Sequence, residues 1–81
     1  MTHAETLAAI KALPDMTATR TDGEYRVTFN TIAIRTANLA AGVSTSFAFV
    51  QARAEAVACY TNDASDALAT AQAMQAKGYQ A

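Results

Sequence analysis

The dipeptide Asp22-Gly23 constrains the fold of this chain more than any other feature of its sequence. It separates two runs, residues 16–21 and 24–30, in which apolar and polar side chains alternate as they do along a β-strand. Asp-Gly is a preferred pair for a type I′ turn, because both central residues of that turn need positive φ. The sequence therefore predicts a tight β-hairpin at this position.

The turn also sets the register of the hairpin, because it places Thr21 opposite Glu24 and each earlier residue opposite a later one. With this register, one face of the hairpin carries an apolar set: Met16, Ala18, Tyr25, Val27 and Phe29. The other face carries polar residues: Thr17, Thr19, Arg26 and Thr28. A shift by one residue would scatter the apolar set over both faces, so we expect a single register.

A helix is predicted near each end of the chain. Thr2 and Glu5 have the spacing of a capping box, and Pro14 would end a helix over about residues 3–13. Asp63 is a suitable N-cap for the second helix, and Gly78 is a suitable stop. The predicted buried stripe of this second helix is mostly alanine: Ala64, Ala67, Leu68, Ala71 and Met74. Such a stripe would let the helix approach a sheet closely.

The residues between the hairpin and the last helix fit more than one secondary structure. Residues 31–36 alternate like a strand with Ile32 and Ile34 on one side, and residues 38–46 indicate a loop or a short helical turn. Residues 47–50 favour a strand, and a helix continuing through Ala54 is the alternative, because alanine favours helices. Residues 54–60 are predicted to form a further strand.

Together these elements predict one small α+β domain over residues 1–81. Its expected order is a helix, a β-hairpin, one or two further antiparallel strands and a second helix. Both helices are expected on one face of the sheet.

Composition narrows the classes of function. The chain has six Lys and Arg residues, seven Asp and Glu residues and a net charge of -1. It therefore lacks a basic stripe for phosphates, and no direct contact with nucleic acid is expected. Its one cysteine excludes an internal disulfide, which is typical of a reducing compartment, and no long apolar run predicts a membrane span. We expect a cytoplasmic protein without a cofactor.

No pattern of side chains predicts catalysis or metal binding. His3 is expected to be an exposed first-turn residue, and a nucleophilic Cys59 would need a base within hydrogen-bond reach. Asp63 and Asp66 are explained by helix capping, and no cluster of Cys and His offers metal ligands. Cys59 itself is expected to be a small buried apolar residue. If it is exposed instead, it could form an intermolecular disulfide and so a homodimer.

A resemblance adds a hypothesis about function. Residues 55–63, Glu-Ala-Val-Ala-Cys-Tyr-Thr-Asn-Asp, are followed by Asp66 in the run Asp-Ala-Leu-Ala-Thr-Ala. This stretch resembles small proteins of phages and plasmids that carry Ala-Tyr-Tyr-Thr-Asp-Asp and then Asp-Ala-Leu-x-Thr-Ala. Residues 24–27 resemble their Glu-Tyr-Arg-Val strand. The chain departs from these proteins at Cys59, where an aromatic residue is usual, and at residues 31–53, which resemble an insertion.

Proteins of this size and origin include anti-CRISPR proteins, which inhibit a bacterial immune complex by binding it. The resemblance thus implies a non-enzymatic protein that binds a host protein complex, most concretely an inhibitor that blocks target-DNA binding by a CRISPR effector. The candidate contact residues are polar positions expected to be exposed on the sheet and loops: Thr19, Arg26, Thr28 and Arg35.

The second class of function is a nucleic-acid-binding or regulatory module. The predicted order of helix, three strands and helix resembles the double-stranded-RNA-binding domain. That domain uses a basic cluster at the start of its last helix to contact phosphates. This chain has Asn62, Asp63 and Asp66 at the corresponding place, where no residue is basic and the two carboxylates would repel phosphate.

Overall fold

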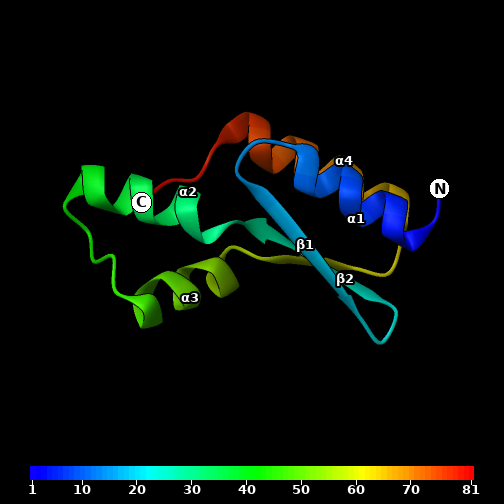
Figure 1. Ribbon diagram of the computed structural model, residues 1–81, viewed down its shortest axis with the longest axis horizontal. Coiled ribbons are helices and arrows are strands. Elements are labelled where there is room, and N and C mark those ends of the chain that lie inside the picture. Colours follow the sequence, from blue (N-terminus) through cyan, green and yellow to red (C-terminus); the bar gives the residue numbers. More distant parts are fainter.

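The computed structural model describes residues 1–81 as four helices and one three-stranded sheet (Figure 1). The elements are, in chain order, α1 (His3–Ala12), β1 (Met16–Thr21), β2 (Glu24–Phe29), α2 (Thr31–Ala41), α3 (Phe47–Ala56), β3 (Cys59–Thr61) and α4 (Ala64–Lys77). The strands are antiparallel, and β2 lies between β1 and β3. The predicted α+β class is confirmed.

The hairpin forms as the sequence predicts. Asp22 and Gly23 have φ values of +52° and +80°, as a type I′ turn requires. Thr21 pairs with Glu24, and the register continues to Met16 opposite Phe29. The apolar residues of the predicted inner face are all buried: Met16, Ala18, Tyr25, Val27 and Phe29.

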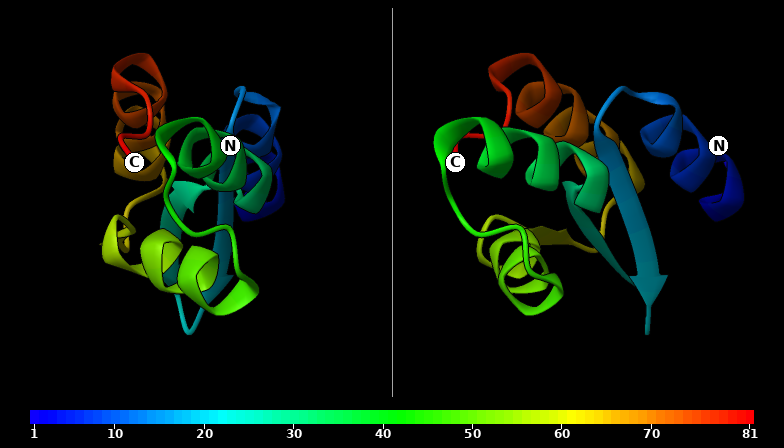
Figure 2. Two further views of the ribbon diagram at one scale, coloured as in Figure 1. Left: turned by 90° about the vertical axis from the view of Figure 1, so that its left-hand side faces the viewer. Right: turned by 60° about the vertical axis from the view of Figure 1, so that its left-hand side comes forward.

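The two terminal helices cover the apolar face of the sheet. Figure 2 shows α1 and α4 side by side on that face, and α1 contacts β1 while α4 contacts β2 and β3. The capping box of Thr2 and Glu5 is present, and the Asp63 side chain accepts a hydrogen bond from the backbone of Asp66. The sequence predictions for both helices are therefore confirmed.

Residues 31–36 and 47–53 differ from the favoured prediction, whereas residues 38–46, expected as a loop or a short helical turn, are the end of α2 followed by a loop. Residues 31–36 form the first half of α2 rather than a strand, because the Asn30 side chain caps a helix by accepting from the Ala33 N–H at 2.8 Å. Residues 47–50 begin α3, capped by Ser46, so the strand prediction is wrong and the alternative helix is observed. This helix continues to Ala56, which shortens the third strand to Cys59–Thr61.

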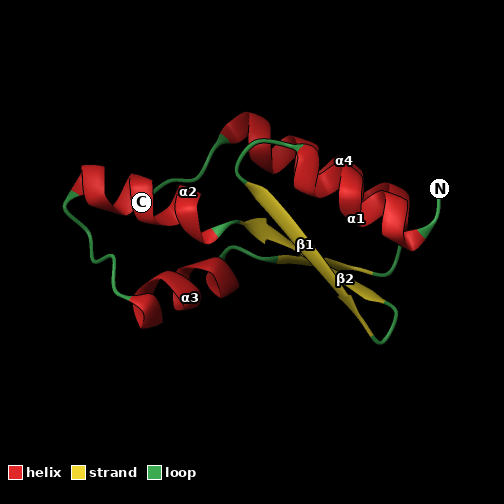
Figure 3. Ribbon diagram, viewed as in Figure 1, coloured by secondary structure: helices red, strands yellow, loops and turns green.

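The added helices form a pair at one end of the molecule, as the helix colouring of Figure 3 makes plain. The molecule measures 40 × 24 × 15 Å, and α2 packs mainly on α3. The end of α3 lies on the opposite face of the sheet from α1 and α4. On that face the Thr28 hydroxyl donates a hydrogen bond to the Ala54 carbonyl of α3. The α2–α3 pair thus extends the small domain along its long axis.

Candidate functional site

The structure divides the predicted contact residues between two places. Thr19 and Arg26 are cross-strand partners on the sheet face that α1 and α4 leave uncovered, and Thr19 is exposed. Thr28 belongs to the same face but is buried. Arg35 lies on α2, exposed, in a separate surface. The four residues therefore do not form one site.

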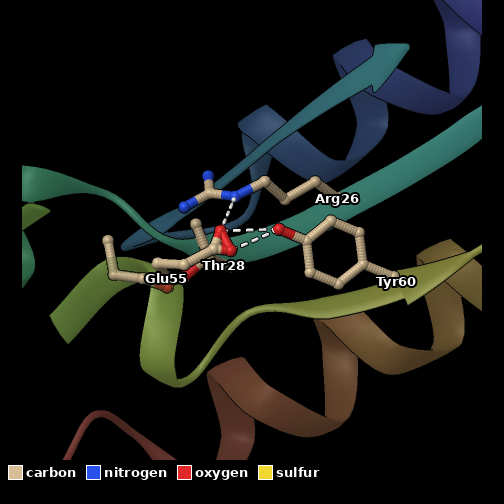
Figure 4. A network of polar contacts seen from close by, with 5 residues as sticks. Arg26, Thr28, Glu55 and Tyr60 are labelled. Carbon is tan, nitrogen blue, oxygen red and sulfur yellow. Dashed lines mark hydrogen bonds and ion pairs between the residues drawn. The ribbon is translucent and has the colours of Figure 1, made fainter. Parts of the chain in front are cut away.

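Arg26 belongs to a small polar network on this sheet face (Figure 4). Its Nε donates to Glu55 Oε1 at 3.1 Å, which is the single salt bridge of the chain. The Tyr60 hydroxyl donates to the same oxygen at 2.6 Å and also reaches Oε2. The Glu55 carboxylate of α3 therefore bonds to a side chain of β2 and to one of β3. These bonds connect the end of α3 to the sheet.

Thr28 is a structural residue rather than an exposed contact residue, which corrects the prediction. Its hydroxyl donates to the Ala54 carbonyl at 2.7 Å, and Ala54 is itself buried. The last carbonyls of a helix have no partner within the helix, so this bond satisfies one of them. Alternation along β2 gives the face of Thr28 correctly, but it could not show that α3 covers this position.

The network shifts the ionisation of its members. The hydrogen bond from Tyr60 lowers the pKa of the Glu55 carboxyl below its ordinary value, and the hydrogen bond from Arg26 contributes a smaller lowering. The folded form therefore gains stability from Glu55 at pH values above the ordinary carboxyl pKa, and this gain is lost as the pH falls through the lowered pKa. The bond to Glu55 also raises the pKa of the Tyr60 hydroxyl, because ionisation would remove the donated proton.

This coupling gives a testable result. Glu55→Gln is expected to lower the pKa of Tyr60 toward its ordinary value, because the amide no longer opposes a phenolate. The measurement is a pH titration of the Tyr60 ring signals by NMR. Glu24→Gln is the control, since Glu24 is exposed and takes no part in the one salt bridge of the chain. An unchanged Tyr60 pKa in Glu55→Gln would show that the network does not persist in solution.

A second exposed surface combines large apolar side chains with polar ones, and the strand predictions for residues 31–36 and 47–50 do not reveal it. It lies where α2 meets the start of α3, and its exposed residues are Ile32, Arg35, Thr36, Leu39, Thr45 and Phe47. We refer to these six residues as the α2–α3 surface. Ile32, Leu39 and Phe47 are 72%, 74% and 80% exposed, although each is a large apolar side chain.

The helical period explains this surface. Residues 32, 35, 36 and 39 form one stripe along α2, whereas Ile34 and Asn38 lie on the buried stripe. In a strand over residues 31–36, Ile32 and Ile34 would lie on the same face. In the observed helix they lie on different faces, and only Ile34 is buried. A count of apolar residues at the helical spacing would have revealed the exposed stripe.

The α2–α3 surface is hollowed around Arg35. One open hollow of about 300 Å³ is lined by Ile32, Arg35, Thr36, Leu39 and Thr45. A second hollow of about 400 Å³ is lined by Thr31 and Arg35 of α2, by Thr45, and by Phe47, Val50 and Gln51 of α3. Arg35 therefore borders both hollows, and no carboxylate lines either.

Cys59 is exposed, so the prediction that it is buried is wrong. It pairs with Val27 on the apolar face of the sheet, but β3 is an edge strand of three residues, and Cys59 lines an open hollow with Met74 and Lys77 of α4. Because the thiol is exposed, it is accessible for an intermolecular disulfide. His3 is exposed as expected, yet its Nδ1 lies 2.7 Å from the hydroxyl of the fully buried Tyr25, and no pattern in the sequence predicts this contact.

No group of three or more His, Cys, Asp and Glu side chains could hold a metal ion, and no helix is both long and apolar enough to cross a membrane. Comparisons with protein-family models, with curated proteins and with solved structures find no match. The case for a function therefore depends on the surfaces themselves.

Proposed function

We propose that this protein acts by binding another protein through the α2–α3 surface. The observation that carries the proposal is the exposure of Ile32, Leu39 and Phe47, each more than 70% accessible on adjoining helices. Large apolar side chains exposed on one surface are typical of a protein-binding surface, and arginine is enriched among the residues of such surfaces. Covering these side chains would provide hydrophobic free energy in proportion to the apolar area removed from water.

The specific form of the proposal is an inhibitor that binds a host protein complex and blocks target-DNA binding by a CRISPR effector. The support for this partner is the resemblance of residues 55–63 and of the Asp66 segment to small proteins of mobile elements. The apolar surface is consistent with inhibition by occupying a partner's surface, which needs no reactive group.

The alternative, a nucleic-acid-binding module, has less support. Two helices stand between β2 and β3, so the order differs from that of the double-stranded-RNA-binding domain. The start of α4 carries Asp63 and Asp66, whereas phosphate binding there would require basic side chains. A mobility-shift assay across a salt series would show salt-sensitive binding if this alternative were correct.

The inhibitor proposal can be tested in cells that carry an active multisubunit CRISPR system. Expression of the wild-type protein is expected to restore plating of a targeted phage. Ile32→Asp and Phe47→Asp should remove this effect, because each places a charge in the contact. Both positions lie in the first turn of a helix, where an acidic side chain is favourable, so both variants should fold.

Ser65→Asp is the matched control, because it adds the same charge to the exposed first turn of α4. It should inhibit as well as the wild-type protein. Circular dichroism and thermal unfolding would verify that all three variants are folded. Inhibition that survives both Ile32→Asp and Phe47→Asp would exclude the α2–α3 surface as the binding site, and absence of inhibition by the wild-type protein would exclude the CRISPR target.

A further inference from the structure

The segment that forms the α2–α3 surface contains basic residues but no acidic ones. Residues 30–54 contain Arg35 and Arg53 and no Asp or Glu, so all seven acidic residues lie outside this segment. Arg53 donates to the Tyr79 hydroxyl and lies over its ring. Arg35 has no hydrogen-bond or salt-bridge partner in the chain, because the one salt bridge is that of Arg26 with Glu55.

Arg35 also occupies the middle of the apolar stripe. Ile32 precedes it by one helical turn and Leu39 follows it by another, and these two apolar residues lie about 10 Å apart along α2. Exposed arginine flanked by large apolar side chains is typical of the centre of a protein interface, where its guanidinium pairs with a carboxylate. The hydroxyls of Thr36 and Thr45 beside it can add neutral hydrogen bonds.

A second copy of this chain does not fit the surface. In a two-fold pairing of α2 with α2, Ile32 of one copy would meet Leu39 of the other, and the two Arg35 side chains would meet near the axis. No carboxylate in residues 30–54 could separate these like charges. The cost of bringing unpaired charges together at a desolvated interface opposes this dimer.

From these observations we infer that the α2–α3 surface accepts an acidic amphipathic helix of a partner protein. Apolar side chains of that helix cover Ile32, Leu39 and Phe47, and an Asp or Glu on the same face pairs with Arg35. This inference rests on the proposed function, since it names the chemical class of the partner for the same surface.

The test uses a phage-displayed library of single helical peptides, selected on the wild-type protein and counter-selected on Ile32→Asp. The enriched peptides are expected to combine apolar residues at spacings of three, four and seven with an Asp or Glu on the same face. A labelled member of the enriched set is then titrated with each variant by fluorescence anisotropy.

The charge pair is tested by exchanging its charges. Arg35→Glu should weaken peptide binding by about tenfold or more, and a peptide with Lys in place of its acidic residue should recover binding to Arg35→Glu. Lys11→Glu, the same charge change on exposed α1, is the control and should bind as the wild-type protein does. Selection of basic or uncharged helices, enrichment of no peptide at all, or binding unaffected by Arg35→Glu would overturn the inference.

Sedimentation of the wild-type protein completes the test. With a reductant present to prevent a disulfide at the exposed Cys59, a monomer is expected, and a dimer that dissociates on Ile32→Asp would show that a second copy is the occupant and contradict the inference. The two proposals can fail separately. If Ile32→Asp abolishes inhibition in cells and Arg35→Glu does not, the proposed function stands and the acidic partner is excluded. If acidic helices are selected but phage plating is never restored, the CRISPR target alone is excluded.

Discussion

Replacing Tyr79 with alanine is expected to lower the free energy of unfolding by about 2–4 kcal/mol, a large part of the stability of a domain this small. Tyr79 follows α4, and its ring packs edge-on against Phe29 with 5.6 Å between centroids. The Arg53 guanidinium lies 5.7 Å from the same ring centroid. The ring therefore joins the C-terminal segment to both β2 and α3.

The hydroxyl of Tyr79 extends this connection to α2. It accepts a hydrogen bond from Arg53 Nε at 3.1 Å and donates one to Asn38 Oδ1 at 3.2 Å. Asn38 is fully buried, and its Nδ2 donates to the Ser44 carbonyl at 3.0 Å. Removing the hydroxyl would take its donor from Oδ1 of the buried Asn38, and a buried acceptor left without a partner destabilises the folded state.

Tyr79→Phe separates the two contributions, because it keeps the ring and removes only the hydroxyl. We expect it to cost about 1–2 kcal/mol. Urea denaturation measures both variants, and amide hydrogen exchange should show faster opening in α2 and α3 than in β1 and β2. If Tyr79→Ala unfolds at the same urea concentration as the wild-type protein, the C-terminal segment does not hold the helical pair in place.

The parts of the fold that the sequence predicted correctly depend on local signals. The Asp22-Gly23 turn needs positive φ at both positions, and few other dipeptides adopt it easily. The capping residues of α1 and α4 bond to backbone groups only three positions away. Such signals can be recognised in a few consecutive residues, because the groups that interact are close together in the sequence.

The favoured strand predictions for residues 31–36, 47–50 and 54–56 were wrong because the signals there are weak or shared by two structures. Ile32 and Ile34 fit a strand by alternation, and the cap that decides for a helix is the preceding Asn30. The alanines near Ala54 extend α3 into residues expected to be a strand. The β-branched and aromatic residues of this segment favour strands only as a weak tendency that tertiary packing overrides.

The contact residues show the same limit. Arg26 was placed correctly on the polar sheet face, but its partner Glu55 lies 29 positions away in a helix that was not expected. Thr28 is buried by that same helix. Arg35 was chosen as a sheet residue, and it lies instead at the centre of an exposed helical stripe. A residue's chemistry can be read from the sequence, whereas the surface it joins depends on the packing of distant segments.

Replacing Ala71 with leucine should test how closely α4 lies on the sheet, with an expected loss of about 1–3 kcal/mol in the free energy of unfolding. Ala71 and Ala67 are both fully buried, on the stripe of α4 that faces β2 and α1. A larger side chain there must displace α4 from neighbours that already fill the space, because protein interiors are close-packed. The core contains only 11 buried apolar residues, so few others can adjust to the added volume.

Ala69→Leu is the matched control, since Ala69 lies on the exposed side of the same helix. Alanine and leucine both favour helices, so helix propensity contributes little to either variant. Thermal unfolding should therefore show Ala69→Leu within about 0.5 kcal/mol of the wild-type protein. Equal stability of Ala71→Leu and Ala69→Leu would mean that α4 does not depend on small residues to meet the sheet. A loss confined to Ala71→Leu would show that the alanine stripe sets the spacing between α4 and β2.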